Sequence, residues 1–167
     1  MSTNIRLATD TDWPQILSIY RYYWDKHFEN MPEDYEKLLG YLKDSFDSRH
    51  DYFNYWVYDN GEGEIYGWQS CLQVFNSPLR RDFNGELSTY VSHDKQNGLV
   101  AARLGNYVVK ETLPKSPIKV LWTFIDPSNL PSQKLAAAYG FIKVIEALAN
   151  SKYRESVELW TKTFNKN

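Results

Sequence analysis

The positions of apolar and polar residues along the chain predict a series of strands and helices. Apolar residues that recur every three or four positions indicate two early helices, one from Trp13 to near His27 and Phe28, and one that begins at Pro32. Period-two alternation, or a short apolar run between turn residues, indicates a strand. The predicted strands cover residues 5–8, 52–58, 65–75, 86–91, 118–125, 141–145 and 155–163.

The chain is organised around residues 85–111, which predict a strand, a polar turn and a helix in that order. Helical spacing of apolar residues resumes at Leu99, and a second, shorter helix is expected over residues 130–138. A turn that opens a helix presents free backbone N–H groups and the positive end of the helix dipole, which favour a phosphate. Every strand-to-helix turn offers these donors, so a purely structural turn is the alternative.

The turn itself carries a more specific pattern. Gln96-Asn97-Gly98-Leu99-Val100-Ala101 resembles the acetyl-CoA-binding motif Gln/Arg-x-x-Gly-x-Gly/Ala of the GNAT superfamily of N-acetyltransferases. Leu99 stands where the family has its middle glycine. In a second register Gly98 is that glycine, and Lys95 and Val100 then occupy the first and last positions of the motif.

Other segments are similar to this family in the expected order. Gly67-Trp68 and Glu86-x-Ser88-x-Tyr90-Val91 are similar to the phosphinothricin N-acetyltransferase branch, and Asn129 with Tyr139-Gly140-Phe141 resembles the later helix and closing Gly-Phe. The resemblance implies an α/β (α+β) fold of the GNAT acyl-CoA N-acyltransferase type, with a mixed, mostly antiparallel central sheet flanked by helices. It also implies that acetyl-CoA enters where the two middle strands part.

The resemblance further implies roles for particular residues. Glu86 is the expected catalytic base, acting directly or through a water. The backbone of Tyr90 and Val91 is expected to hold the pantetheine arm and to face the thioester carbonyl. The remaining expected contacts to acetyl-CoA are the pyrophosphate turn and an asparagine on the pantetheine arm, namely Gln96, Asn97, Gly98, Leu99, Val100, Ala101, Ala102 and Asn129.

Two positions depart from the family and leave alternatives open. Leu99 lacks the close backbone approach that a glycine permits. Ala136 stands where a tyrosine commonly protonates the departing thiolate, and Tyr139 is expected in the core instead. The expected function is acetyl-CoA-dependent N-acetylation of a small primary amine, including an amino-acid-like one. The alternatives are a catalytically weak or inactive domain that binds a CoA ester or a small ligand as a sensor, and an acetyltransferase for protein N-termini or lysines.

Length and charge restrict the classes of protein. A chain of 167 residues suits one domain over 1–167. The net charge of −2 argues against nucleic-acid binding. Residues 1–83 carry a net −6 and residues 84–167 a net +4, which fits an anionic cofactor in the second half and an amine attracted by the first. Arg80 and Arg81 are candidates for holding an acceptor carboxylate, with a solvated loop pair as the simpler role.

The remaining features predict few partners. The single cysteine, Cys71, cannot form an intramolecular disulfide and is expected in the core. The three histidines lack the spacing of metal ligands, so no metal is expected. No signal-peptide or membrane-spanning run is found, so we expect a cytoplasmic protein that binds no membrane. A homodimer formed through an exposed strand stays open.

Overall fold

The structure is a computed structural model that describes residues 4–25, 29, 32–74, 83–95, 99–147 and 156–164. It contains two compact units, residues 1–70 with 89–104 and residues 71–88 with 105–167. Within the described residues, hydrogen-bonded strands form one seven-stranded sheet in the order β1-β2-β3-β4-β5-β7-β6. The pairing of β4 with β5 is parallel, and the pairs β1–β2, β2–β3, β5–β7 and β6–β7 are antiparallel. This confirms the predicted mixed, mostly antiparallel sheet. The expectation of a single domain stays a prediction.

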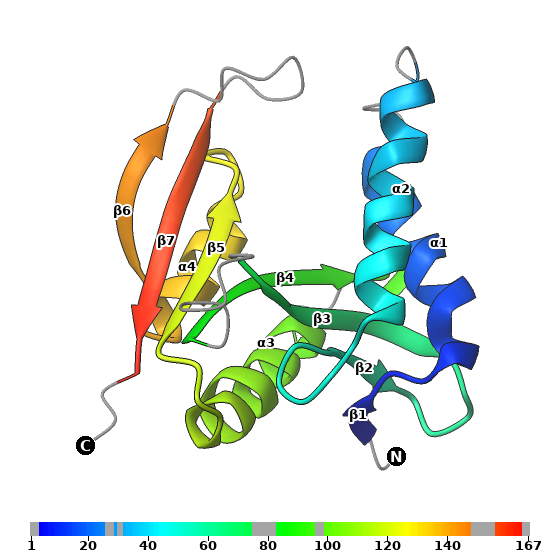
Figure 1. Ribbon diagram of the computed structural model, residues 1–167, viewed down its shortest axis with the longest axis horizontal. Helices are drawn as coiled ribbons and strands as arrows, with labels where there is room; N and C mark the ends of the chain where they lie inside the picture. Colours follow the sequence, from blue (N-terminus) through cyan, green and yellow to red (C-terminus); the bar gives the residue numbers. More distant parts are fainter. Residues whose placement is uncertain are drawn as a thin grey trace. The chain divides into compact units, whose positions relative to one another are not determined.

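The first unit contains the N-terminal strands and helices (Figure 1). Its elements are β1 (Asn4–Leu7), η1 (Asp10–Asp12), α1 (Trp13–Trp24), α2 (Pro32–Asp47), β2 (Tyr55–Asp59), most of β3 (Ile65–Gln73), η3 (His93–Lys95) and the start of α3 (Leu99–Gly105). The hairpin between β2 and β3 turns through Gly61 and Gly63, whose φ angles are 89° and 86°. Glycine adopts these left-handed values without the clash that a side chain would cause.

Aromatic rings fill the core of the first unit. Trp68 on β3 is fully buried, and its indole N–H donates to the carbonyl oxygen of Ile16 on α1 at 3.1 Å. Its ring lies 5.5 Å from that of Tyr55 and 6.4 Å from that of Tyr20. Burial of rings of this size makes the largest apolar contribution per residue, so Trp68 fixes α1 on the sheet.

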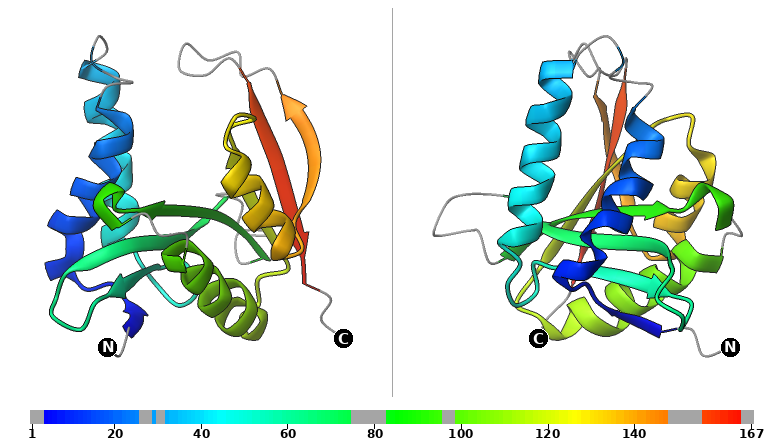
Figure 2. Two further views of the ribbon diagram at one scale, coloured as in Figure 1. Left: turned by 180° about the vertical axis from the view of Figure 1, so that it is seen from behind. Right: turned by 90° about the vertical axis from the view of Figure 1, so that its right-hand side faces the viewer.

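The second unit contains the rest of the sheet and the later helices (Figure 2). Its elements are most of β4 (Asn84–Val91), η4 (Asn106–Thr112), η5 (Leu113–Lys115), β5 (Val120–Ile125), α4 (Leu130–Ala138), β6 (Ile142–Ala147) and β7 (Val157–Thr163). The predicted strand at 118–125 starts two residues late, because the Ile118 N–H bonds the Ser116 hydroxyl instead of a neighbouring strand. Leu121 and Ile125 are buried, whereas Phe124 is exposed.

The helix predicted from Leu99 changes its hydrogen bonding along its length. It is α-helical to Gly105 and π-helical from Asn106 to Thr112. At the junction a Cβ on Gly105 would lie 2.3 Å from the ring of Tyr139, so only glycine allows the helix and this ring to approach so closely. No helix in the described ranges is long and apolar enough to cross a bilayer.

Candidate functional site

Strand β4 carries the predicted chemistry. Its pairing with β5 runs from Asn84↔Val120 through Gly85↔Leu121 to Glu86↔Trp122, and β4 itself continues to Val91. Side chains alternate along a strand, so Glu86 and Tyr90 lie on one face of β4. The parallel pairing with β5 therefore includes the residue predicted to be the base.

Glu86 has the electrostatic character of a candidate base. Burial raises the pKa of its carboxyl above the ordinary value of 4.5. Among the described residues, none forms a hydrogen bond or ion pair with this carboxylate. A partly buried, unpaired carboxylate binds a proton more tightly than an exposed one, which suits a group that accepts a proton near neutral pH.

Cys71 lies beside Glu86 and has a structural role. Its thiol is fully buried, and a Cβ on Gly85 would lie 2.5 Å from the sulfur. Burial, and secondarily the charge of Glu86, raise the pKa of the Cys71 thiol far above its ordinary value. A thiolate is therefore disfavoured here, and the prediction that Cys71 belongs to the core is confirmed.

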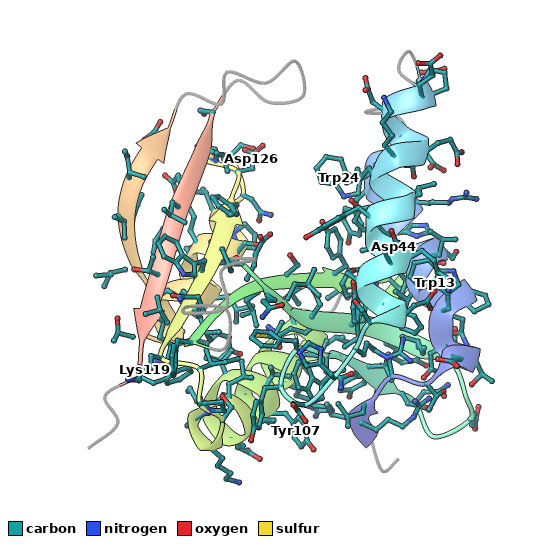
Figure 3. All side chains as sticks on the ribbon, in the orientation of Figure 1. Trp13, Trp24, Asp44, Tyr107, Lys119 and Asp126 are labelled. Carbon is teal, nitrogen blue, oxygen red and sulfur yellow. The ribbon has the colours of Figure 1, made fainter. Side chains whose placement is uncertain are left out.

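The end of β4 is held by aromatic side chains of the first unit. The ring of Tyr90 stacks on Trp68 at 4.7 Å between centroids, and its hydroxyl accepts from the Trp24 indole N–H at 3.2 Å. The Tyr23 hydroxyl donates to the Val91 carbonyl oxygen. Figure 3 labels Trp24 among these side chains. Hydrogen bonds and stacking thus fix both residues predicted to contact the pantetheine arm.

Gly67 allows β3 to lie close to this end of β4. A Cβ at Gly67 would lie 2.9 Å from the Tyr90 carbonyl oxygen and 2.8 Å from a methyl of Val100 on α3. Just after the end of β4, the Ser92 backbone N–H donates to the Tyr66 carbonyl oxygen at 2.9 Å. The Gly-Trp pair therefore has a packing reason: the glycine admits β4, and the tryptophan fills the opposite face.

The predicted pyrophosphate turn is described only in part. Gln96, Asn97 and Gly98 lie outside the described residues, as do Arg80 and Arg81. The Leu99 side chain, at the first position of α3, is 56% exposed. Val100 is buried, whereas Ala101 and Ala102 are half-buried.

In the second unit, Asn129 is the N-cap of α4. Its side-chain oxygen accepts from the Ser132 N–H at 3.2 Å, which satisfies one of the free donors of the first helical turn. Ala136 is buried, and so is Tyr139, whose pKa is raised by burial. The prediction that Tyr139 belongs to the core is confirmed.

Sequence reasoning missed two residues near this chemistry. Trp122 pairs with Glu86 across the sheet, and the Tyr23 hydroxyl holds Val91. The alternation of 120–125 shows that Trp122 and Phe124 share a face, but it does not show that this face is the one with Glu86. That information lies in the parallel register between β4 and β5.

The comparisons with known proteins agree with this fold. Neither the family models nor the curated proteins compared with the sequence gave a match. Among solved structures, a protein assigned as a phosphinothricin N-acetyltransferase is similar at a TM-score of 0.77 and 20% identity, covering 99% of this chain and 100% of its own.

Two further structures extend the likeness. An N-acetyltransferase from Staphylococcus aureus Mu50 matches at a TM-score of 0.75 and 18% identity, covering 99% of this chain and 100% of its own. A Salmonella typhimurium protein assigned as an acetyltransferase, solved with its cofactor acetyl-CoA, matches at 0.74 and 18%, covering 100% of this chain and 96% of its own. The predicted resemblance is thus confirmed in the fold, and the chain has the GNAT acyl-CoA N-acyltransferase fold.

Proposed function

We propose that this protein is an acetyl-CoA-dependent N-acetyltransferase that acts on the primary amine of a small acceptor. The observation that carries the proposal is Glu86, a partly buried carboxylate without a partner among the described residues, on β4 of a GNAT fold. A carboxylate that is costly to bury and has no structural partner favours a functional role over a structural one.

The reaction proceeds by direct attack in a ternary complex. Glu86, directly or through a water, takes the proton from the acceptor ammonium. The amine lone pair then attacks the thioester carbonyl carbon, so that the C–N bond forms and the C–S bond breaks; CoA leaves as a thiolate, and the second proton on the nitrogen passes to solvent water. Since Ala136 supplies no acid at the family's tyrosine position and Tyr139 is buried in the core, water protonates the thiolate.

The chain offers several groups suited to acetyl-CoA. On this proposal the backbone of Tyr90 and Val91, at the end of β4, supplies amides for the pantetheine arm and a donor for the thioester oxygen. Asn129 uses its oxygen for the helix cap, which leaves its side-chain N–H₂ to donate to the arm. The exposed Leu99 side chain is compatible with pyrophosphate on the backbone of Gln96 to Ala102.

The test is calorimetric titration with acetyl-CoA, free CoA and dephospho-CoA, followed by turnover assays of the wild type and Glu86→Gln. We expect micromolar binding of acetyl-CoA by both proteins and a loss of about 10²–10⁴-fold in kcat for Glu86→Gln. Acetyl-CoA binding without turnover of any amine or peptide in the wild type would instead favour the sensor. Turnover of peptides alone would favour the protein acetyltransferase, and absence of binding would exclude both acetyltransferases and leave a domain that binds another ligand.

A further inference from the structure

The three strands β5, β7 and β6 have two very different faces. Leu121 and Ile125 on β5 are buried, and Figures 1 and 2 show α4 along one side of these strands. On the other face the alternate residues of β5 are half-buried or exposed. In Figure 3, Lys119 and Asp126 mark the two ends of β5. One face of this ribbon is therefore core, and the other is open.

The strand register defines which residues share the open face. Trp122 pairs with Thr161 on β7, which pairs with Ile142 on β6. The next row on the same face joins Phe124, Leu159 and Ile145. We call Trp122, Phe124, Ile142, Ile145 and Leu159 the apolar platform.

Three residues of the platform are exposed, Trp122 and Leu159 are half-buried, and one end of the platform lies beside Glu86. Phe124, Ile142 and Ile145 are 48%, 67% and 53% exposed. Glu86 pairs with Trp122, and paired residues of neighbouring strands point to the same face. Gly85 agrees with this assignment, because its missing Cβ would point toward Leu121 and Cys71 on the buried face.

Charge on this face is confined to one end. In the paired rows from Asn84 to Ile145, the described residues contribute one ionisable side chain, Glu86. Lys143 does not interrupt the platform, because it lies on the opposite face with Glu158, its ion-pair partner at 2.9 Å. The Trp122 indole N–H donates to the Asn84 side-chain oxygen at 3.3 Å, which holds the ring beside Glu86.

We propose that the platform binds the body of the acceptor, and that the acceptor is an amine on an apolar alkyl or aryl group. This inference rests on the proposed function and names its substrate class. The Glu86 carboxylate complements the acceptor ammonium, and the rows beyond it complement an apolar body. Rows on one face of a strand are about 7 Å apart, so a phenylethyl or hexyl group reaches from Glu86 to Phe124.

An amino acid fits the same surface poorly. The platform rows hold no cationic side chain among the described residues to pair with a carboxylate, and Glu86 repels one. The proposed acceptor therefore carries no carboxylate, whereas the sequence left an amino-acid-like amine open.

The test compares 2-phenylethylamine with phenylalanine, which has the same body and adds a carboxylate. In acetyl-CoA turnover assays we expect kcat/KM for 2-phenylethylamine to exceed that for phenylalanine at least about ten-fold. Along a series from ethylamine to hexylamine, kcat/KM should rise about two- to four-fold per methylene as each is buried. Equal or better use of phenylalanine would overturn the inference and leave the proposed function standing.

Variants locate the effect on the platform. Phe124→Ser should raise KM for 2-phenylethylamine several-fold with acetyl-CoA binding unchanged, and Phe124→Leu should largely restore it. Val144→Ser is the matched control, because Val144 is 56% exposed on β6 but lies outside the paired rows. It should leave KM unchanged.

Two outcomes separate the inference from its rivals. If the platform instead binds a second copy of the chain, Phe124→Ser will shift the mass measured by light scattering toward the monomer without changing KM for amines. That result overturns the inference. Absence of acetyl-CoA binding in calorimetry overturns the proposed function itself, whereas acetyl-CoA binding without turnover of 2-phenylethylamine overturns only the acceptor class.

Discussion

The two units use their aromatic residues in different ways. In the first unit Trp68, Tyr90 and Tyr20 pack ring against ring, and Trp68 is fully buried. In the second unit Trp122 and Phe124 lie on an open sheet face, where Phe124 is 48% exposed. These rings of the first unit therefore build a core, whereas Trp122 and Phe124 of the second unit line a surface. What distinguishes them is whether a helix covers the face on which they lie.

The largest expected effect is the difference in free energy of unfolding between a variant of the buried Trp68 and a variant of the exposed Phe124. Trp68→Ala should lower the free energy of unfolding by about 3–5 kcal/mol, because it leaves a cavity and removes the indole N–H bond to the Ile16 carbonyl. Phe124→Ala should cost under about 1 kcal/mol, because the ring is half in solvent already. Denaturant titrations of both variants measure the difference. Similar losses would mean that the Phe124 face is covered in solution.

Alanine substitutions at two glycines test whether β4 lies as close to Gly67 of β3 as the structure shows. Gly67→Ala should destabilise the protein by about 1–3 kcal/mol, because its Cβ would lie within 2.9 Å of the Tyr90 oxygen and the Val100 methyl. Gly40→Ala is the matched control, since nothing lies within 4 Å of its added Cβ in α2. It should stabilise the helix by up to about 1 kcal/mol. Thermal unfolding with equal signs for the two variants would contradict this packing.

Removal of the Tyr23 hydroxyl tests whether its hydrogen bond to Val91 positions the end of β4. Tyr23→Phe removes the donor to the Val91 carbonyl and should cost about 1 kcal/mol in stability, with weaker acetyl-CoA binding in calorimetry. Tyr22→Phe serves as the control, because the Tyr22 ring stacks on His93 and its hydroxyl has no hydrogen-bond partner in the described part of the chain. If both variants bind acetyl-CoA alike, the Tyr23 bond does not position the strand.

The smallest expected effect on stability is that of the substitution Glu86→Gln. Because burial raises its pKa, the folded protein holds this proton more tightly than the unfolded chain. The stabilisation is fully present below the unfolded pKa and is lost as the pH rises through the folded pKa. Glu86→Gln stays neutral, so its Tm should match the wild type near about pH 4 and exceed it slightly above about pH 7. A lower Tm for Glu86→Gln at neutral pH would show that the carboxylate has a structural partner.

The order of strands and helices could be predicted from the sequence because each has its own period. The change to π-helix after Gly105 could not, since the spacing of apolar residues does not distinguish α-helical from π-helical hydrogen bonding. The position of Glu86 and Tyr90 on one face follows from alternation alone. The position of Trp122 beside Glu86 required the register between β4 and β5, which neither strand encodes by itself.

The edge strand β6 has an evolutionary consequence. Its pairing steps from Lys143↔Trp160 to Ile145↔Leu159, so Val144 is an extra residue. Beyond it, Ile145 lies on the same face as Ile142, and Glu146 lies near Lys143 on the other face. Loss of the Val144 codon would therefore leave the chemistry of both faces unchanged. A one-residue change of length at Val144 is therefore one that β6 can accept without exchanging its two faces.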